Sequence, residues 1–334
     1  MSKLYYMPTK VIMGNGCIAA NSGLLADMGK KALIVTGRHS AKANGSLVDV
    51  IAVLNANKQE YVIFDSVMAN PTIECAYAGA AFARENSADF VIAIGGGSPM
   101  DAAKAMALLA RQDIREEDLF SGVYSGDVLP MAFVPTTAGT GSEVTQYSIL
   151  TNHKAETKTS IASPVIFPKL AFLDARYMEG LSYTTTINTA IDALSHSVEG
   201  MLSNRASTIS DSLAMESIRL IASCFESLKN RSLTREQRES LLYASTLAGM
   251  VIANTGTTAV HAMGYSLTYY KDIDHGRANG LLLAAFLGFV EKSLPDRVRT
   301  ILSGMKLSAV KEFSSVLEDL LGEKESISMD EKIK

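Results

Sequence analysis

Three histidines and an aspartate in the second half of the chain have the residue types and spacing of a metal site. Asp192 and His196 lie four positions apart in a largely apolar stretch, so a helix would place both on one face. His261 and His275 follow, fourteen positions apart. A carboxylate in apolar surroundings needs a partner, and three imidazoles with one carboxylate suit iron, zinc or another transition metal ion. An Asp–His hydrogen bond between satisfied core residues is the alternative that this spacing leaves open.

A glycine-rich segment in the first half has the composition of a phosphate-binding turn. Gly96 and Gly97 follow an apolar run that is typical of a buried strand, and a helical pattern comes next. We expect Ser98 to cap this helix, with Pro99 at its first position and Asp101 at its third. A free helix N-terminus would then face a pyrophosphate. A plain strand–helix turn is the alternative, because the segment lacks the GxGxxG spacing.

A second loop of similar character lies further along the chain. Residues 135–145 again follow an apolar run, and they contain two glycines and five hydroxyl side chains. The hydroxyl-bearing residues are Thr136, Thr137, Thr140, Ser142 and Thr145. Hydroxyl and backbone N–H groups suit the oxygens of ribose and phosphate. Two such loops at the carboxyl ends of strands predict a dinucleotide site, although each alone could be an ordinary turn.

The elements that must position these residues differ between the two halves. Strands are expected over residues 32–35, 61–64, 89–94 and 129–134, and helices over residues 72–85 and 98–110. This alternation predicts a doubly wound α/β domain. Beyond residues 174–181 the pattern is helical, over residues 185–202, 208–228, 234–253, 260–267 and 276–294. We therefore expect an α/β dinucleotide-binding domain over residues 1–180 and an all-helical metal-binding domain over residues 181–334.

Composition narrows the classes of function. The 334 residues carry a net charge of −4, which does not suggest a nucleic-acid groove or a polybasic membrane surface. Three distant cysteines make a poor disulfide framework, and we see neither a signal peptide nor a spanning segment, so we expect a cytoplasmic protein. The remaining histidines, His39 and His153, lie in polar surroundings and are expected at the surface. A polar tail follows Gly322.

Together these motifs resemble those of the iron-dependent (group III) alcohol dehydrogenases. GGGSPMDAAKA, PTTAGTGSEVT, DALSHSVEG and the pair His261 and His275 occur in the family's order, and the resemblance runs from about Tyr5 to beyond His275. The chain looks most like the 1,3-propanediol and lactaldehyde/propanediol dehydrogenases. The resemblance implies an N-terminal α/β domain with a doubly wound, mostly parallel sheet and an all-α C-terminal domain, the architecture also found in dehydroquinate synthase. It further implies a homodimer or larger assembly.

The resemblance also assigns roles to residues. Asp192, His196, His261 and His275 match the metal ligands, and among them His261 and His275 are expected to be catalytic. Expected cofactor contacts are Gly37, Arg38, Ser40, Asn70, Gly96, Gly97, Ser98, Asp101, Thr136, Thr137, Thr140, Ser142, Thr145, Tyr147 and Lys158. Among these, Lys158 matches a lysine that reaches the cofactor ribose, and Asn70 matches a contact near the adenosine half.

Three departures from the family pattern have consequences. Members that prefer NAD carry an aspartate where this chain has Gly37, followed by Arg38, so we expect NADP(H) to be favoured over NAD(H). Some members have a further histidine where this chain has Tyr265, which places a proton route through that side chain in doubt. The chain ends at Lys334, where relatives commonly continue with further helices, so we expect either a short helical domain or a truncated protein.

The expected reaction is hydride transfer between a small primary alcohol or diol, or the matching aldehyde, and NAD(P). The metal, Fe2+ or alternatively Zn2+ or another divalent ion, would act as a Lewis acid on the substrate oxygen. Within the same group of folds, a zinc-dependent glycerol dehydrogenase or a dehydroquinate synthase-like enzyme is the alternative. From other classes, a metal-dependent hydrolase and a non-catalytic nucleotide-binding protein are the rivals.

Overall fold

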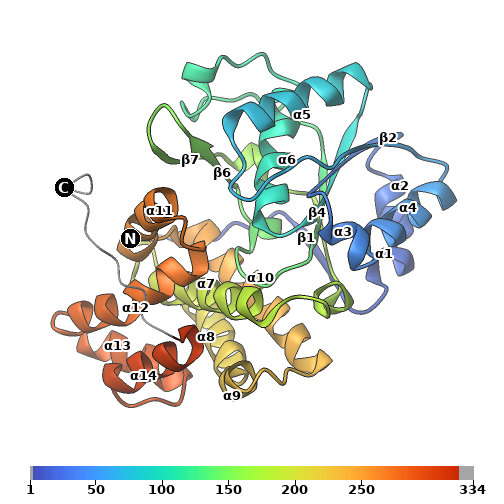
Figure 1. Cartoon of the computed structure of the whole chain (residues 1–334). Coiled ribbons are helices and arrows are strands. Elements are labelled where there is room, and N and C mark those ends of the chain that lie inside the picture. The colour runs from blue at the N-terminus through green and yellow to red at the C-terminus, as the bar shows by residue number, and fades with distance from the viewer. Residues whose placement is uncertain (1–2, 323–334) are drawn as a thin grey trace.

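The first half of the chain folds around a six-stranded parallel sheet (Figure 1). The computed structural model describes residues 3–322. The strand order is β1-β8-β5-β4-β2-β3, and every pairing is parallel. The strands are β1 (Lys10–Met13), β2 (Lys31–Thr36), β3 (Glu60–Phe64), β4 (Phe90–Gly95), β5 (Met131–Pro135) and β8 (Leu170–Leu173). Strands β6 (Tyr147–Asn152) and β7 (Thr157–Ala162) form a separate antiparallel hairpin.

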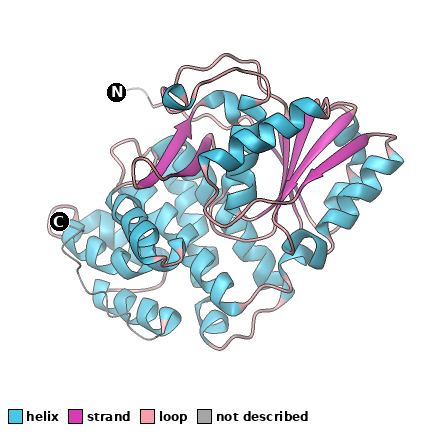
Figure 2. Cartoon of the chain, turned by 45° about the horizontal axis from the view of Figure 1, so that its top comes forward, coloured by secondary structure: helices cyan, strands magenta, loops and turns pink. Residues whose placement is uncertain are grey.

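Helices cover both faces of this sheet (Figure 2). They are α1 (Cys17–Ala20), α2 (Ser22–Ala26), α3 (Ser40–Ala43), α4 (Ser46–Ala56), α5 (Ile73–Glu85) and α6 (Gly97–Leu109). Alternate strand residues enter different cores: Ile34 and Ile92 pack with Leu54 of α4, whereas Val35 and Val91 pack with residues of α5 and α6. A strand buried on both faces must be apolar throughout, which explains the continuous apolar runs of β2 and β4.

The strand order reverses direction between β2 and β4. From β2 the chain continues to β3 on one side, whereas from β4 it continues to β5 on the other. Loops that leave adjacent strands in opposite directions open a crevice between them, and ligands of open α/β sheets bind there. Gly37 follows β2, and Gly96 and Gly97 follow β4, so the strand order brings these segments to the same edge.

The second half of the described chain is helical. Its helices are α7 (Tyr183–Leu202), α8 (Thr208–Ala222), α9 (Phe225–Lys229), α10 (Arg235–Thr255), α11 (Ala259–Lys271), α12 (His275–Glu291), α13 (Pro295–Gly304) and α14 (Val310–Leu321). Short 3-10 turns complete the fold: η1 (Glu116–Asp118), η2 (Ser142–Val144), η3 (Pro164–Ile166) and η4 (Ala175–Met178). Residues of α7, α8, α10, α12, α13 and α14 share one core that is distinct from the two sheet cores, although it also takes in Ala138 and Leu173 of the first half. This separation supports a boundary near residue 180, which we retain as a proposal.

The structure confirms the four predicted strands and adds four others. The predicted ranges 32–35, 61–64, 89–94 and 129–134 coincide with β2, β3, β4 and β5 to within two residues at either end. Three of the other strands give a weaker signal: β1 is a four-residue edge strand, and β6 and β7 carry polar side chains, with β7 (TKTSIA) mostly half-exposed. The fourth, β8, is apolar and buried but only four residues long, so its run was missed because it is short. The sheet itself is entirely parallel.

Two helix predictions were wrong in detail. The helix expected over residues 208–228 is two helices, because the backbone tightens after α8: the N–H of Cys224 bonds to the carbonyl of Ile221, only three residues back. Ser98 does not cap α6. Gly96, in an extended conformation, is the N-cap, and the Ser98 hydroxyl instead accepts a hydrogen bond from the N–H of Asn70.

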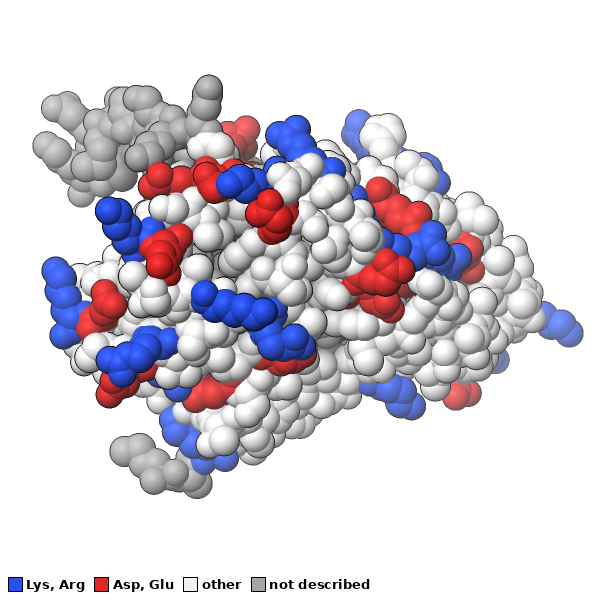
Figure 3. All heavy atoms as spheres, turned by 90° about the horizontal axis from the view of Figure 1, so that it is seen from below, with Lys and Arg blue, Asp and Glu red and all other residues white. Residues whose placement is uncertain are grey.

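The surface carries charges of both signs. On the face in Figure 3, lysine and arginine side chains alternate with aspartate and glutamate, in keeping with the near balance of charges in the sequence. His39 and His153 are exposed, as expected. Among residues 3–322, no helix combines the length and apolar character needed to cross a membrane. The polar tail after Gly322 lies outside the described residues.

Candidate metal and nucleotide site

One stripe of helix α7 carries the polar side chains of the candidate metal site. Asp192, His196 and Glu199 recur at intervals of four and three residues, so they lie on one face of the helix. All three are buried. Burying two carboxylates in one helix face is costly unless charged or donating groups surround them. The partners of these carboxylates come from α11 and α12.

His261 and His275 bring their rings to Asp192. His261 lies in the first turn of α11, and His275 is the first residue of α12, with Asp274 as its N-cap. The Nε2 atoms of His261 and His275 lie 3.6 and 3.8 Å from Oδ1 of Asp192. Ligand atoms of these three residues all lie within 4.8 Å of one another. The structure thus brings together three of the four predicted ligands.

His196, the fourth predicted ligand, is adjacent but differently placed. Its ring stacks on that of His261, with the centroids 4.5 Å apart and the planes 20° from parallel. Its nitrogens are not part of the group within 4.8 Å. Its assignment as a ligand stays a prediction.

The amide of Asn279 lies among the three converging ligand atoms. Nδ2 donates to Oδ1 of Asp192 at 2.9 Å and lies 3.2 and 3.3 Å from the Nε2 atoms of His261 and His275. An amide nitrogen has two hydrogens and cannot satisfy three acceptors. A cation has no such limit, so three acceptors that point at one place fit a metal ion better than they fit this amide.

The protonation states also suit metal ligation. Burial lowers the pKa of His196 to about 4 and that of His275 to about 3, so both rings are neutral near pH 7. Burial alone would lower the pKa of His261 as well, but the carboxylates of Asp192 and Glu199 outweigh it and raise the pKa to about 9. Burial likewise opposes ionisation of Asp192, yet the surrounding histidines hold its pKa below the usual range. The site therefore offers an ionised carboxylate and two neutral imidazoles, while His261 is protonated near pH 7 without a metal and would release a proton when a metal ion binds.

Atoms without partners point to the same chemistry. Nδ1 of His196 and Nδ1 of His275 are buried and have no hydrogen-bond partner among the described residues. Such groups are rare in native proteins and call for an explanation, for which an ion is one of the usual candidates. The residues present therefore fit a divalent metal.

The two predicted nucleotide loops pack against each other. The N–H of Thr136 donates to the carbonyl of Gly95 at 2.8 Å, which joins the ends of β5 and β4. A Cβ on Gly96 would approach Oγ1 of Thr137 to 2.9 Å, and a Cβ on Gly97 would approach Cγ2 of Thr140 to 2.6 Å. These glycines are therefore needed for the contact between the loops, whether or not a phosphate also lies against them.

A buried lysine joins three of the predicted cofactor contacts. Lys104 Nζ donates to Ser142 Oγ at 2.8 Å, to Thr145 Oγ1 at 3.1 Å and to the Tyr147 carbonyl at 2.7 Å. Ser142 in turn donates to Oδ1 of Asp101 at 2.6 Å. Burial lowers the pKa of Lys104 to about 8. The side chains of Asp101, Ser142 and Thr145 thus form an internal network that holds the second loop in place, and their contact with a cofactor stays a prediction.

A second polar cluster links the nucleotide loops to the metal site. Lys158 Nζ donates to Oδ1 of Asn70 at 2.7 Å and lies 5.9 Å from the ring centre of Tyr265. The ring of Tyr265 stacks on His275, with the centroids 5.2 Å apart and the planes 17° from parallel. Asn70 also contacts Ser98, as described above. Lys158 and Tyr265 therefore bridge the space between the predicted cofactor loop and a predicted metal ligand.

The segment after β2 lies at the surface. Arg38 and Ser40 are exposed, and Gly37 is partly exposed. A Cβ on Gly37 would meet only the Val67 carbonyl oxygen, at an ordinary contact distance of 3.5 Å. Glycine is thus not required at position 37 by close packing.

The structure reveals three site residues that the sequence analysis missed. Lys104, Glu199 and Asn279 each bond to a predicted site residue from a fully buried position. Lys104 and Glu199 lie inside the quoted motifs GGGSPMDAAKA and DALSHSVEG, where a charge in an apolar helical pattern was the available signal. Asn279 follows His275 by four residues and so lies on the same helix face.

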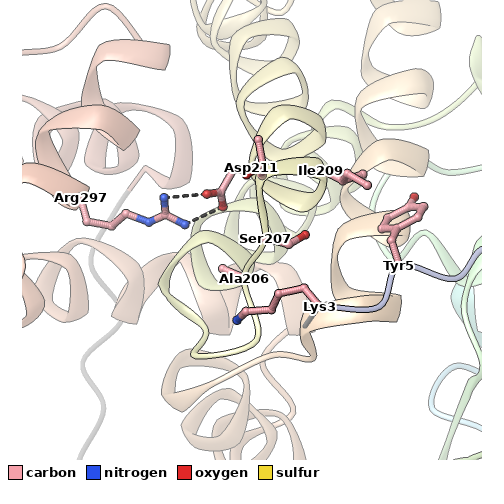
Figure 4. Close-up of a pocket in the computed structure, with 8 residues that line it drawn as sticks. Lys3, Tyr5, Ala206, Ser207, Ile209, Asp211 and Arg297 are labelled. Atoms are coloured by element: carbon pink, nitrogen blue, oxygen red, sulfur yellow. Dashed lines mark hydrogen bonds and ion pairs between the residues drawn. The ribbon is translucent and has the colours of Figure 1, made fainter. Parts of the chain in front are cut away.

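A hollow of about 570 Å3 lies elsewhere, between the N-terminal segment and helices α8 and α13 (Figure 4). Its main charged groups are already paired: Arg297 binds Asp211, and Lys3 donates to the carbonyl of Asn204. None of the predicted site residues lines it. We therefore do not assign the chemistry of the protein to this hollow.

Family models cover nearly all of the described chain. A model described as iron-containing alcohol dehydrogenase matches residues 8–175, and one described as the C-terminal part of the Fe-containing alcohol dehydrogenase family matches residues 186–327. The interval between the two matches includes the boundary proposed near residue 180.

Individual relatives agree with these matches. The NADPH-dependent butanol dehydrogenase of Clostridium saccharobutylicum is 31% identical over 91% of this chain and 78% of its own length. The 1,3-propanediol dehydrogenase of Klebsiella pneumoniae is 36% identical over 76% of this chain and 66% of its own length. The solved structure of an iron-containing alcohol dehydrogenase from Thermotoga maritima is 41% identical, with a TM-score of 0.89 over 98% of this chain and 89% of that chain. These matches do not favour a hydrolase or a glycerol dehydrogenase.

Proposed function

Because the chain belongs to the iron-containing alcohol dehydrogenase family, and so to the metal-dependent, NAD(P)-linked alcohol oxidoreductases, we propose that it interconverts small primary alcohols or diols and their aldehydes at the site described above. One observation carries this proposal: Asp192, His261 and His275, of which the first two are buried, present their ligand atoms within 4.8 Å of one another in the helical half. His196 would complete the set by turning its ring.

The proposed chemistry divides between bound groups and protein residues. When bound, the metal would supply Lewis-acid polarisation of the substrate oxygen, and the nicotinamide would supply or accept the hydride. Asp192 would contribute the negative charge that offsets a divalent ion, His275 would contribute a neutral donor, and His261 would do so once it has lost a proton. His275, with side-chain exposure of 23%, is more accessible than Asp192 or His261. We therefore place the substrate on the His275 side of the site.

The aromatic ring of Tyr265 would form one wall of the substrate pocket. It lies against His275 and beneath the ammonium group of Lys158. Burial raises the pKa of the Tyr265 hydroxyl above its ordinary value, so the phenol remains protonated and is a poor base near pH 7. A proton route that uses a histidine in some relatives would here run through water or through Lys158, whose pKa burial lowers.

We place the nicotinamide cofactor in the crevice formed by the two glycine- and threonine-rich loops and the segment after β2. Gly96, Gly97 and Ser98 would face the pyrophosphate, and Lys158 would reach a ribose. Asn70 would lie near the adenosine half, and Thr136, Thr137, Thr140, Thr145 and Tyr147 would make further cofactor contacts. Support comes from the meeting of these segments at the β2–β4 crevice, where ligands of such sheets bind.

We propose that NADP(H) is favoured over NAD(H). Gly37 offers no carboxylate that would repel a 2′-phosphate, and exposed Arg38 and Ser40 stand next to it. The NADPH-dependent butanol dehydrogenase among the relatives is consistent with this preference. Asp65 opposes this preference, because its carboxylate also attracts Arg38. The pKa of the Asp65 carboxyl is lowered mainly by Lys42, which donates to it at 2.7 Å, and to a smaller extent by Arg38.

Assembly and location remain proposals that follow the family pattern. We propose a homodimer or a larger homo-oligomer in the cytoplasm, acting on a small-molecule alcohol or aldehyde without a nucleic-acid or membrane partner. Size-exclusion chromatography with light scattering tests the assembly.

Metal analysis paired with a substrate panel tests the proposed function. The purified protein is loaded with Fe2+ or Zn2+ under anaerobic conditions and assayed with linear alcohols, diols and aldehydes, in both directions, with NADH and NADPH. We expect about one metal ion per chain and turnover that His261→Ala abolishes together with metal binding. Full metal content and turnover in His261→Ala would refute the assignment.

A further inference from the structure

We propose that Glu199, which matches none of the predicted ligands, is a positioning residue that orients His261 for metal binding. The inference rests on the proposed function, since it assigns His261 to the metal. Glu199 is fully buried on α7, one turn beyond His196. Its two carboxylate oxygens bind different parts of α11, and the two sets of contacts have different consequences.

One oxygen of Glu199 holds the beginning of helix α11. Oε1 accepts hydrogen bonds from the backbone N–H and the hydroxyl of Thr258, both at 2.7 Å, and from the N–H of Val260 at 3.1 Å. Thr258 is the N-cap of α11, but its own side chain does not cap the helix. Glu199 therefore supplies, from another helix, the acceptor that the free N–H groups of this helix end require. This contact fixes where α11 begins, and with it the backbone of His261.

The other oxygen fixes the ring of the same histidine. Oε2 of Glu199 makes a short hydrogen bond with Nδ1 of His261. A carboxylate oxygen can only accept, so Nδ1 must carry the hydrogen. In a neutral ring the lone pair is then on Nε2, the atom that faces Asp192 and lies in the group of converging ligand atoms. Glu199 thus selects the tautomer of His261 that is able to bind a metal, and makes that ring a stronger donor.

The other two histidines lack such support. Nδ1 of His196 and Nδ1 of His275 have no partner among the described residues, so no carboxylate fixes their tautomers in the same way. Among the three histidines, a carboxylate would therefore act on the metal only through His261. A metal ligand held at both its backbone and its ring by one carboxylate is the best-oriented donor of the set.

The substitution Glu199→Gln separates the two contacts. A glutamine amide can keep its oxygen on the three converging donors of α11, but its NH2 group then faces Nδ1 of His261 and forces the hydrogen onto Nε2. The opposite orientation preserves the tautomer of His261 but sets NH2 against the N–H groups of Thr258 and Val260. The first orientation leaves fewer donors unpaired, so the helix end should persist while metal binding weakens.

Glu143→Gln is the matched control. Glu143 is also a buried glutamate that bonds to a helix of the second half, where Thr246 Oγ1 donates to it at 2.7 Å, and it contacts no histidine. Both variants replace a buried carboxylate by an amide of the same shape. A loss of metal affinity that follows from general destabilisation would appear in both, whereas a loss that acts through His261 would appear only in Glu199→Gln.

The experiment measures the affinity of the metal-free, full-length proteins for Co2+ and Zn2+ against a competing chelator. We expect Glu199→Gln to bind about 10- to 100-fold more weakly than wild type, with a changed Co2+ absorption spectrum, and Glu143→Gln to bind like wild type. Equal affinities of Glu199→Gln and wild type, or equal losses in both variants, would overturn the inference. If wild type and His261→Ala bind Co2+ equally, the proposed function itself fails.

A second measurement does not depend on the folding of any variant. In zinc-loaded wild type with 15N-labelled histidine, we expect one imidazole N–H, on Nδ1 of a ring bound through Nε2, with its proton shifted far downfield by a carboxylate acceptor. The chain has only five histidines, and two of them are exposed, so the signal is assignable. A spectrum in which no metal-bound histidine carries such a proton would contradict the role of Glu199.

Discussion

A methyl group added at Gly249 should loosen the contact between the helical half and the second nucleotide loop. Gly249 lies inside α10 and faces Gly141, whose φ of +60° turns the loop towards the helix. A Cβ on Gly249 would meet the carbonyl oxygen of Gly141 at 2.6 Å and its Cα at 2.8 Å, and Cγ2 of Val144 at 2.8 Å. Two of these three atoms are backbone, so the loop itself must move.

The size of the effect follows from two opposing contributions. Replacing glycine by alanine inside a helix stabilises it by about 0.5–1 kcal/mol. Forcing a methyl group into a packed contact costs about 1–3 kcal/mol. We therefore expect Gly249→Ala to destabilise the protein by about 0–2.5 kcal/mol. Gly288→Ala, also inside a helix, is the control: its Cβ would meet only Cγ1 of Val310, at 3.7 Å, so we expect a gain of about 0.5–1 kcal/mol.

Urea denaturation and cofactor titration measure the two consequences. We expect Gly249→Ala to unfold at a lower urea concentration than Gly288→Ala, and to bind the nicotinamide cofactor several-fold more weakly, because the displaced loop carries predicted cofactor contacts. Gly288→Ala should bind the cofactor as wild type does. If Gly249→Ala were as stable as Gly288→Ala and bound the cofactor equally well, the contact between α10 and the loop would not position the site.

Three further predictions concern other parts of the structure. Gly37→Asp has room for its side chain and should shift the ratio of NADPH to NADH affinities towards NADH; an unchanged ratio would show that position 37 does not select the cofactor. Burial lowers the pKa of Lys104 to about 8, from 10.5 in the unfolded chain. Between these two pH values the unfolded state therefore binds more protons than the folded state. The free energy of unfolding of wild type should rise by up to about 3 kcal/mol as pH increases through this window. Denaturation measured at several pH values should show no such rise in Lys104→Met. Removing the metal with a chelator should lower the unfolding midpoint, because an ion at 100 times its Kd adds about 2.7 kcal/mol to the free energy of unfolding. An unchanged midpoint in wild type would mean that the ion is not bound to the folded site.

The sequence predicted most of the α/β fold because its central strands are buried on both faces. Runs such as FVIAIG in β4 contain no polar interruption and end in glycines that turn the chain. The hairpin of β6 and β7 gave no such signal, since its serines, threonines and lysine pair with polar neighbours: Thr151 with the Asn70 carbonyl, and Lys158 with the Asn70 side chain. Contacts of this kind are made between distant segments and leave no periodic pattern.

The candidate site was predictable as a set of residues but not as an arrangement. The interval between Asp192 and His196 indicates a shared helix face, whereas their distance from His261 and His275 depends on how α7, α11 and α12 pack. The role of Asn279 could not be predicted from its type, because an asparagine in a helix is ordinarily a surface residue. Only the packing of α12 on α7 brings its amide to Asp192.

Anomalous diffraction at the iron edge, from crystals grown anaerobically with Fe2+, tests the central claim most directly. We predict one strong peak at about 2.0–2.3 Å from the carboxylate of Asp192 and from the Nε2 atoms of His261 and His275, with the ring of His196 turned towards it. A peak elsewhere, or none at these residues in crystals that take up iron, would contradict the proposal that they form the metal centre of an alcohol dehydrogenase.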